Sequence, residues 1–208
     1  MKGLLLKDLY MMKKYCRLYL VIAVLFIALS VSEESNLFFV FYPCLLCSMV
    51  PVNLLGYDER SRWPQYCETM PYSKAQIVSG KYLIGLMLQV SMLTVTGIVQ
   101  AIRMSVNGAF SLREYGTMMM LLIIMAAIAS SLCLPFMFKL GLEKGRIAYY
   151  VTIGLVCACA ALSARLPLHE IQANIGLTTA VAIACLVSIG LYALSWYLSI
   201  VFYKKREL

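Results

Sequence analysis

Residues 57–81 read YDERSRWPQYCETMPYSKAQIVSGK, a polar and charged segment that lies between two long apolar runs. Its own apolar residues recur at the spacing of one helix face, which predicts a short amphipathic helix. They are Trp63, Tyr66, Cys67 and Met70. We expect Asp58 or Ser61 to cap the start of this helix, and Pro71 to end it. A helix of this kind outside a bilayer suggests a soluble partner that binds it.

The chain around this segment is strongly apolar. Of its 208 residues 62% are hydrophobic, and its mean hydropathy is +0.82. A soluble domain is about half apolar, so the composition predicts an integral membrane protein. Six runs are long enough to cross about 30 Å of hydrocarbon as helices. They are Cys16–Ser32, Leu37–Gly56, Tyr82–Ile102, Gly116–Phe138, Ile147–Ser163 and Asn174–Tyr203.

We therefore predict an all-α fold, a bundle of six transmembrane helices in a single domain, residues 1–208. Residues 1–15 predict a helix that lies in the membrane interface. Leu5, Leu9, Met12 and Cys16 would form its apolar face, and its lysines would face water, namely Lys2, Lys7, Lys13 and Lys14. Prolines in the second predicted span, such as Pro51, predict a kink, either static or mobile.

The basic residues predict the orientation. With a cytoplasmic N-terminus, 15 of the 18 lysines and arginines fall on the cytoplasmic side, which is the usual bias. Only Arg103, Arg113 and Arg165 would lie outside. We expect both termini in the cytoplasm, and contact between the basic residues and anionic lipid. Nucleic-acid binding is disfavoured, because the charges are spread over four separate segments.

Several kinds of chemistry lack sequence support. The chain has no phosphate-binding loop motif, and the middle of its predicted spans carries no ionisable side chain. His169 and Glu170 stand together in a predicted outer loop, where a solvated role is simpler than catalysis. Cys44 and Cys47 match half of a zinc site, but packing as free thiols is the simpler interpretation for all eight cysteines. We predict no catalytic and no metal site.

Uncharged polar side chains occur within the predicted spans. Gln89, Thr96 and Gln100 could share one face of the third span. Such groups either join helices or line a substrate path, and we favour helix packing.

The residues of segment 57–81 resemble one branch of the small ABC-2-type permeases of bacterial ABC exporters. The resemblance rests on Asp58-Glu59, Trp63, Tyr66, Met70-Pro71-Tyr72-Ser73-Lys74, Ile77-Val78 and Lys81-Tyr82. Met70 and Lys74 replace the leucine and arginine that are usual in that branch. The opening residues, Gly3 to Leu9, are also similar, with a Lys-Asp pair in the N-terminal elbow helix.

The resemblance implies a permease that dimerises with itself or with a paired permease. Each copy would bind a soluble ATPase subunit, two in all, which carries ATP and Mg²⁺. A coupling helix at about Glu59–Met70 would contact the ATPase. The residues implied in this contact are Asp58, Glu59, Arg60, Trp63, Tyr66 and Met70. The first, second and fifth spans would form the dimer interface and substrate path, with Phe38, Phe41, Tyr42, Asn53 and Thr152 as candidates.

The substrates of similar exporters include amphipathic peptides such as phenol-soluble modulins, lantibiotic-type peptides and other hydrophobic compounds. Other functions stay open at this stage. A substrate-capture subunit of a vitamin importer also has about six spans and a separate ATPase, but it needs no elaborate cytoplasmic helix. An intramembrane enzyme is disfavoured by the missing acid–base groups. An immunity or sensor protein that transports nothing is a further alternative.

Overall fold

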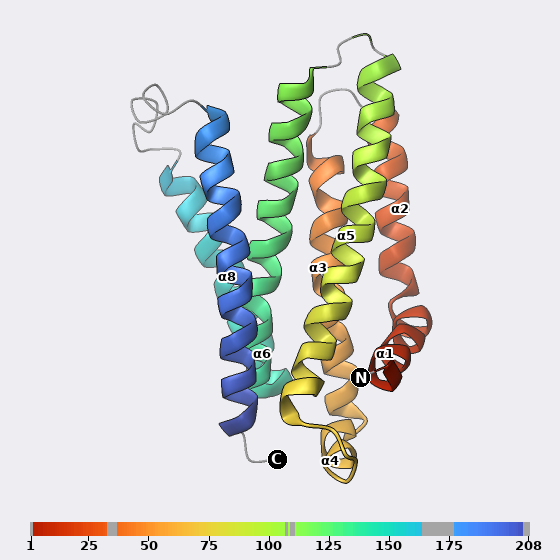
Figure 1. Cartoon of the computed structure of the whole chain (residues 1–208), viewed down its shortest axis with the longest axis vertical. Helices are drawn as coiled ribbons and strands as arrows, with labels where there is room; N and C mark the ends of the chain where they lie inside the picture. The colour runs from red at the N-terminus through yellow and green to blue at the C-terminus, as the bar shows by residue number, and fades with distance from the viewer. Residues whose placement is uncertain (1, 33–36, 107, 109–110, 164–176, 206–208) are drawn as a thin grey trace.

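The chain forms an elongated bundle of helices (Figure 1). The computed structural model describes residues 2–32, 37–106, 108, 111–163 and 177–205. Within these ranges it contains helices and no strand, which confirms the all-α prediction. The helices are α1 (Lys2–Tyr15), α2 (Arg17–Ser32), α3 (Leu37–Arg60), α4 (Trp63–Glu68), α5 (Lys74–Val106), α6 (Leu112–Ser163) and α8 (Leu177–Lys205).

Four helical stretches of the described residues are long and apolar enough to cross a membrane. They are Phe38–Arg60, Lys74–Val106, Leu112–Lys139 and Thr178–Lys205. The apolar part of α2, Arg17–Ser30, is shorter. The prediction of a multi-span membrane protein is therefore supported, whereas the count of six spans stays a prediction.

Helix α6 contains a sharp break at Gly141. Its φ of 77° and ψ of −179° belong to a conformation that glycine adopts readily and other residues do not. The break lies between the predicted fourth and fifth spans. Figure 1 shows the chain turning back here, so that the second part of α6 runs beside α8. Helix α6 thus contributes two helical rods to the bundle, one before Gly141 and one after it.

Helix α3 is central, since it packs against α2, α5 and α6. Its contact with α5 is close at one point. A Cβ atom added to Gly85 would come within 2.8 Å of the Pro51 ring, so α3 and α5 can approach here only because residue 85 has no side chain. Pro51 is therefore part of a tight helix contact, as the packing interpretation of the proline requires.

Polar side chains join the helices inside the bundle. The Gln89 amide donates to the Ala126 carbonyl oxygen and to Ser130 Oγ, both at 2.9 Å, and so links α5 to α6. Gln100 donates to Ser30 Oγ on α2 at 3.3 Å. Both amides are buried, and these contacts support helix packing over a substrate path.

The two ends of the bundle differ in composition. Helix α1, helix α4 and the C-terminal end of α8 lie together at one end (Figure 1). We call this the basic end, because it holds most of the lysines and arginines. Arg103 and Arg113 lie at the opposite end. The segregation has the form expected from the sequence, while the side of the membrane that each end faces stays a prediction.

Helix α1 forms over the predicted residues, but its faces differ from the prediction in two places. Leu5 and Met12 pack against a core cluster around Val50 and Leu54, as expected. Leu9, however, is exposed. Lys7, predicted to face water, turns inward with a side chain only 21% exposed. Lys7 turns inward because it pairs with Asp58 of α3 and with its neighbour Asp8.

Candidate functional site

Four charged side chains from three helices meet at the basic end. We call Lys7, Asp8, Asp58 and Lys81 the ion cluster. Lys81 Nζ lies 2.7 Å from Asp8 Oδ1 and 2.5 Å from Asp58 Oδ2. Lys7 Nζ lies 2.6 Å from Asp58 Oδ1 and 3.2 Å from Asp8 Oδ1. Each lysine thus contacts both carboxylates, and the cluster has no net charge.

The cluster is buried, although it stands near the end of the bundle. The side chains of Asp8, Asp58 and Lys81 are 4%, 4% and 3% exposed. Removing charges from water costs free energy, and mutual attraction offsets this cost only when every charge is paired. The four-way pairing meets that condition. It joins α1, the last turn of α3 and an early turn of α5, and of these α3 and α5 precede and follow α4 in the chain.

Helix α4 begins after a backbone break at Ser61 and Arg62. Arg62 adopts a left-handed conformation with φ of 55° and ψ of 25°, and Pro64 occupies the first turn of α4. Proline is favoured there because its fixed φ suits a helix start and its missing N–H needs no partner. No side chain caps this helix, so the predicted cap by Asp58 or Ser61 is wrong. Ser61 Oγ instead donates to the Asp58 carbonyl oxygen.

Helix α4 is held to the bundle along one side. The Trp63 ring lies under Lys7 Nζ, 4.3 Å from its centroid, a cation–π contact. Cys67 is fully buried. Burial raises the pKa of its thiol, while Lys7 and Lys81 act in the opposite direction and Asp58 adds to the rise.

The other side of α4 faces away from the bundle. Tyr66 is 57% exposed and keeps its ring 5.6 Å from that of Trp63. The predicted amphipathic face is therefore divided, with Cys67 turned inward and Tyr66 outward. The helix also covers fewer residues than the expected Glu59–Met70, because Glu59 and Arg60 belong to the end of α3.

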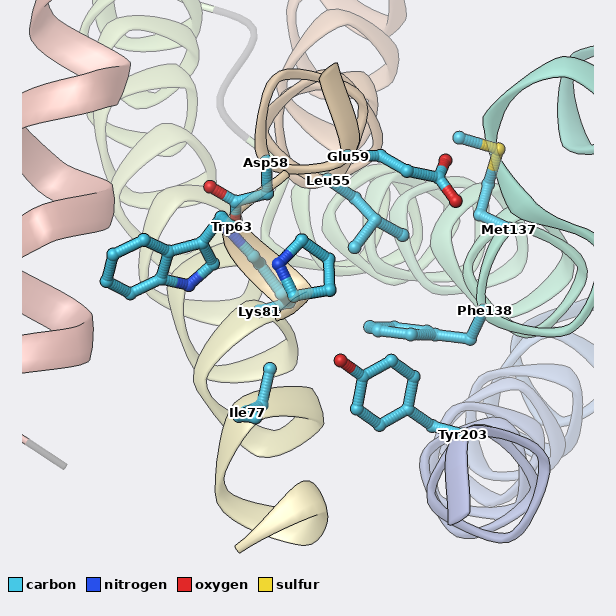
Figure 2. A pocket seen from close by; sticks show the side chains of 10 residues that line it. Leu55, Asp58, Glu59, Trp63, Ile77, Lys81, Met137, Phe138 and Tyr203 are labelled. Atoms are coloured by element: carbon cyan, nitrogen blue, oxygen red, sulfur yellow. The ribbon is translucent and has the colours of Figure 1, made fainter. Parts of the chain in front are cut away.

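A pocket opens beside α4, between α3, α5, α6 and α8. Its lining is mostly apolar and includes Leu55, Trp63, Pro64, Ile77, Met137, Phe138 and Tyr203, with Asp58, Glu59 and Lys81. Figure 2 shows the Glu59 side chain pointing toward Met137, away from Asp58. The two adjacent acidic residues thus lie in different surroundings. Asp58 belongs to the ion cluster, and Glu59 lines the pocket.

The residues expected to contact a partner now fall into two groups. Arg60 and Tyr66 are exposed, and Met70 is half-buried. Asp58 is buried, Glu59 lines the pocket, and Trp63 lies against Lys7. Arg60, Tyr66 and Met70 are therefore accessible to a partner, whereas Asp58 pairs with Lys7 and Lys81, and Trp63 lies against Lys7.

The candidates for a dimer interface or substrate path are also divided. Phe38 and Tyr42 join an aromatic group with Phe26 of α2, in which Tyr42 and Phe26 have ring centroids 4.5 Å apart. Phe41 packs on a different cluster that includes Leu122 of α6. Asn53 is half-buried. The side chain of Thr152 lies outside the described residues, as do His169 and Glu170.

Sequence reasoning missed the ion cluster as a unit. Asp8 and Lys81 both lie in stretches that resemble the exporter permeases. The sequence pattern, however, gave no indication that these two side chains form an ion pair. Six cysteines within the described residues are free. Those residues also contain no group of three or more metal-ligating side chains.

Comparison with known proteins gives one match. The family model described as "ABC-2 family transporter protein" matches residues 3–204. No curated protein and no solved structure matches the chain.

Proposed function

The chain belongs to the ABC-2 family of transporter proteins, and from that premise we propose that it is the permease subunit of an ABC exporter. Membership implies a membrane transport subunit that works with a separate ATPase subunit. Export, the contact residues and the substrate class are the proposed parts. The substrate we propose is an amphipathic or hydrophobic peptide or toxin.

The observation that carries the proposal is the position of α4. This helix lies beyond the ends of the long helices at the basic end (Figure 1) and presents Tyr66 outward. On its inner side, Trp63 and Cys67 contact the bundle. A short, braced helix with an exposed aromatic residue suits docking, because large rigid side chains often dominate binding energy. We therefore propose α4 as the coupling helix and the basic end as cytoplasmic.

The ion cluster supports a route by which ATPase movement reaches the spans. Asp58 lies in the last turn of α3, Lys81 lies in an early turn of α5, and α4 lies between them in sequence. Because the two residues pair directly, a displacement of α4 would act on both helices together. The contacts from Lys7 and Asp8 extend the same displacement to α1.

The proposed substrate path lies between two permease copies or between this chain and a paired permease. The polar amides inside the bundle bind neighbouring helices, which leaves little reason for a path through one copy. Phe38, at 58% exposed, is the most accessible of the described interface candidates, and with Tyr42 it would present an aromatic surface. Such a surface suits an amphipathic substrate, and the ATP and Mg²⁺ would bind on the ATPase.

The test uses the ATPase encoded beside this gene, if one exists there, co-expressed with the tagged chain. Tyr66→Ala should reduce co-purification of the ATPase, since losing an interface anchor costs about 2 kcal/mol or more, roughly 30-fold in affinity. Tyr10→Ala is the matched control, because Tyr10 lies on α1 at the same end and is 67% exposed. It should leave co-purification unchanged.

Equal co-purification of the ATPase with both variants would contradict the docking role of α4. Wild-type chain that binds no ATPase, and carries a tightly bound small molecule instead, would favour the importer subunit. Wild-type chain that binds neither would favour an immunity or sensor protein.

A further inference from the structure

Helix α6 contains a proline, Pro135, in the rod before Gly141. Proline has no N–H, so the carbonyl oxygen of Ser131, four residues earlier, lacks its usual donor within the helix. Another helix supplies one, because Ser195 Oγ of α8 donates to the Ser131 carbonyl oxygen at 2.7 Å. Side chains of neighbouring helices often satisfy such carbonyls in membrane proteins. A serine of α8 thus holds α6 at its proline.

The Ser195 hydroxyl belongs to a longer series of hydrogen bonds. The Tyr82 hydroxyl oxygen on α5 lies 2.8 Å from Ser195 Oγ and 2.7 Å from Ser199 Oγ. Since a carbonyl only accepts, the one proton of Ser195 is used on Ser131, and Ser195 must accept from Tyr82. Tyr82 has no second proton, so Ser199 donates to Tyr82. In order of donation the groups are Ser199, Tyr82, Ser195 and the Ser131 carbonyl, and we call them the hydroxyl chain.

Tyr82 is held firmly at the centre of the hydroxyl chain. It is fully buried, and its ring stacks on that of Trp196 with centroids 5.5 Å apart and planes 9° apart. Trp196 Nε1 donates to Ser79 Oγ at 3.1 Å, and the Tyr192 hydroxyl donates to the Tyr82 carbonyl oxygen at 3.1 Å. The Tyr82 side chain is therefore fixed against α8, and a displacement of α5 at this turn would move its hydroxyl.

The residue before Tyr82 is Lys81 of the ion cluster. Successive residues of a helix point about 100° apart, so the two side chains leave α5 in different directions. Lys81 pairs with Asp8 of α1 and Asp58 of α3, whereas Tyr82 bonds to serines of α8. Because the two residues share one stretch of backbone, a rotation of α5 at this turn would act on the ion cluster and on the hydroxyl chain together.

The packing around Pro135 leaves room for movement. Met137 and Phe138, which follow Pro135 closely in α6, line the pocket beside α4 together with Lys81. Figure 2 shows these side chains around the pocket. The part of α6 just after the proline thus borders open space on this side, so that its position depends more on the bond from Ser195.

We propose that Tyr82 is a positioning residue that couples the ion cluster to the proline of α6. While the cluster is fully paired, Lys81 fixes the turn of α5, Tyr82 holds Ser195, and Ser195 holds the Ser131 carbonyl. A change in the pairing of Lys81 would displace Tyr82, weaken the bond from Ser195 and let α6 flex at Pro135. This coupling acts within one chain. It therefore goes beyond the proposed function and can be tested without an ATPase.

The test is amide hydrogen exchange, followed by mass spectrometry, on the purified chain in nanodiscs of phosphatidylcholine. Exchange in residues 132–139 reports opening of α6 at the proline, and exchange in residues 90–100 of α5 reports global opening. Ser195→Ala should raise exchange in 132–139 about threefold, the factor for one hydrogen bond between membrane helices. Tyr82→Phe keeps the ring but leaves Ser195 without its donor, and should raise it about twofold. Exchange in 90–100 should stay unchanged in both variants.

Two matched controls separate the hydroxyl chain from general packing of α8. Ser188→Ala removes a buried serine hydroxyl of α8 that donates to the Cys185 carbonyl oxygen of its own helix. Tyr192→Phe removes a phenol hydroxyl that also joins α8 to α5. Neither hydroxyl belongs to the hydroxyl chain, so both variants should leave exchange in 132–139 unchanged.

The coupling itself is tested by disturbing the ion cluster. Asp8→Asn removes one charge on α1 and leaves Lys81 paired with Asp58. It should raise exchange in 132–139 about twofold, within the usual range for coupled sites. In the Tyr82→Phe background the same change should add nothing, because the link to α6 is already broken. Lys81→Arg keeps the charge but alters the side-chain geometry, and it should give the same pattern if Asp8→Asn fails to fold.

Three results would overturn the proposal. An equal rise in 132–139 with Tyr82→Phe and Tyr192→Phe would reduce Tyr82 to a packing residue. A rise from Asp8→Asn that multiplies with that from Tyr82→Phe would show that the ion cluster acts on α6 by another route. A rise of the same size in 90–100 would assign the effect to global stability.

Discussion

The basic end and the middle of the bundle join their helices with different kinds of side chain. Both regions must join helices that are far apart in sequence. At the basic end, the ion cluster joins them with four charges, three of whose side chains are almost fully buried. In the middle, Gln89 and Gln100 use uncharged amides, and Gly85 lets two helices touch.

The difference follows from the cost of charge in an apolar environment. A charged side chain at the centre of a bilayer is costly and usually serves function, whereas an uncharged group can hydrogen bond across helices at modest cost. Near the end of the bundle a paired set of charges is tolerable. Such a set is weak evidence for stability, since apolar residues of similar size often serve as well.

This comparison suggests different roles for the two regions. The middle contacts are close and short-ranged, as expected for a part that keeps its packing. The ion cluster joins α1, α3 and α5 through contacts that depend on all four charges being present, and Lys7 of the cluster also contacts Trp63 of α4. We therefore expect substitutions at the basic end to have larger effects, and to depend more strongly on one another, than substitutions in the middle.

The largest expected effect is the loss of one charge from the ion cluster. Lys81→Met leaves Asp8 and Asp58 with Lys7 as their only partner in the cluster, and should destabilise the protein by about 3–5 kcal/mol. Thermal unfolding in detergent measures the change. Lys205→Met is the control, because Lys205 is exposed at the same end, and it should shift stability by about 0.5 kcal/mol or less.

The double variant Asp58→Leu with Lys81→Met sharpens this test. It removes one charge of each sign and leaves Lys7 paired with Asp8, so much of the stability lost in Lys81→Met should return. A double variant as unstable as the sum of its single variants would show that the four charges do not act as one cluster.

Much of the fold could be predicted because hydrophobic length and helix spacing are local properties of the sequence. The end of α2 at Ser32 and the start of α3 at Leu37 match the predicted apolar runs, and two runs were predicted where α6 forms two rods. The end of α3 does not match, because the helix continues past Gly56 into the polar residues up to Arg60. The ion cluster could not be predicted in the same way. Lys7 pairs with a residue 51 positions away, and Lys81 with one 73 positions away, so their meeting depends on how α1 docks.

The site residues show the same limit. Periodicity located Trp63, Tyr66 and Cys67 on a short helix, and Pro64 suited its first turn. It could not tell which side of that helix would face the bundle, because both sides carry apolar residues. In the structure Cys67 is fully buried and the Trp63 ring contacts Lys7 of α1, so the side that faces the bundle is defined by contacts with residues distant in the sequence.

A smaller effect is expected at the close contact in the middle. Gly85→Ala would bring a methyl group to within 2.8 Å of the Pro51 ring, and the helices would have to separate, at a cost of about 1–3 kcal/mol. Gly80→Ala is the control on the same helix, because nothing lies within 4 Å of its added Cβ. It should leave stability unchanged or raise it by up to about 1 kcal/mol. Equal melting temperatures for both variants would count against the close contact.

The smallest effect is expected from Gln89→Leu. This change removes the bonds to the Ala126 carbonyl oxygen and Ser130 Oγ. Ser130 Oγ keeps a partner, since it donates to the same carbonyl at 2.6 Å. The cost should therefore be only about 0.6 kcal/mol, the average for a hydrogen bond between membrane helices. Ser91→Ala is the control, because Ser91 is exposed and its hydroxyl donates to the Leu88 carbonyl oxygen of its own helix. A loss from Gln89→Leu as large as that from Lys81→Met would remove the contrast between the two regions, since an uncharged amide would then matter as much as a buried charge.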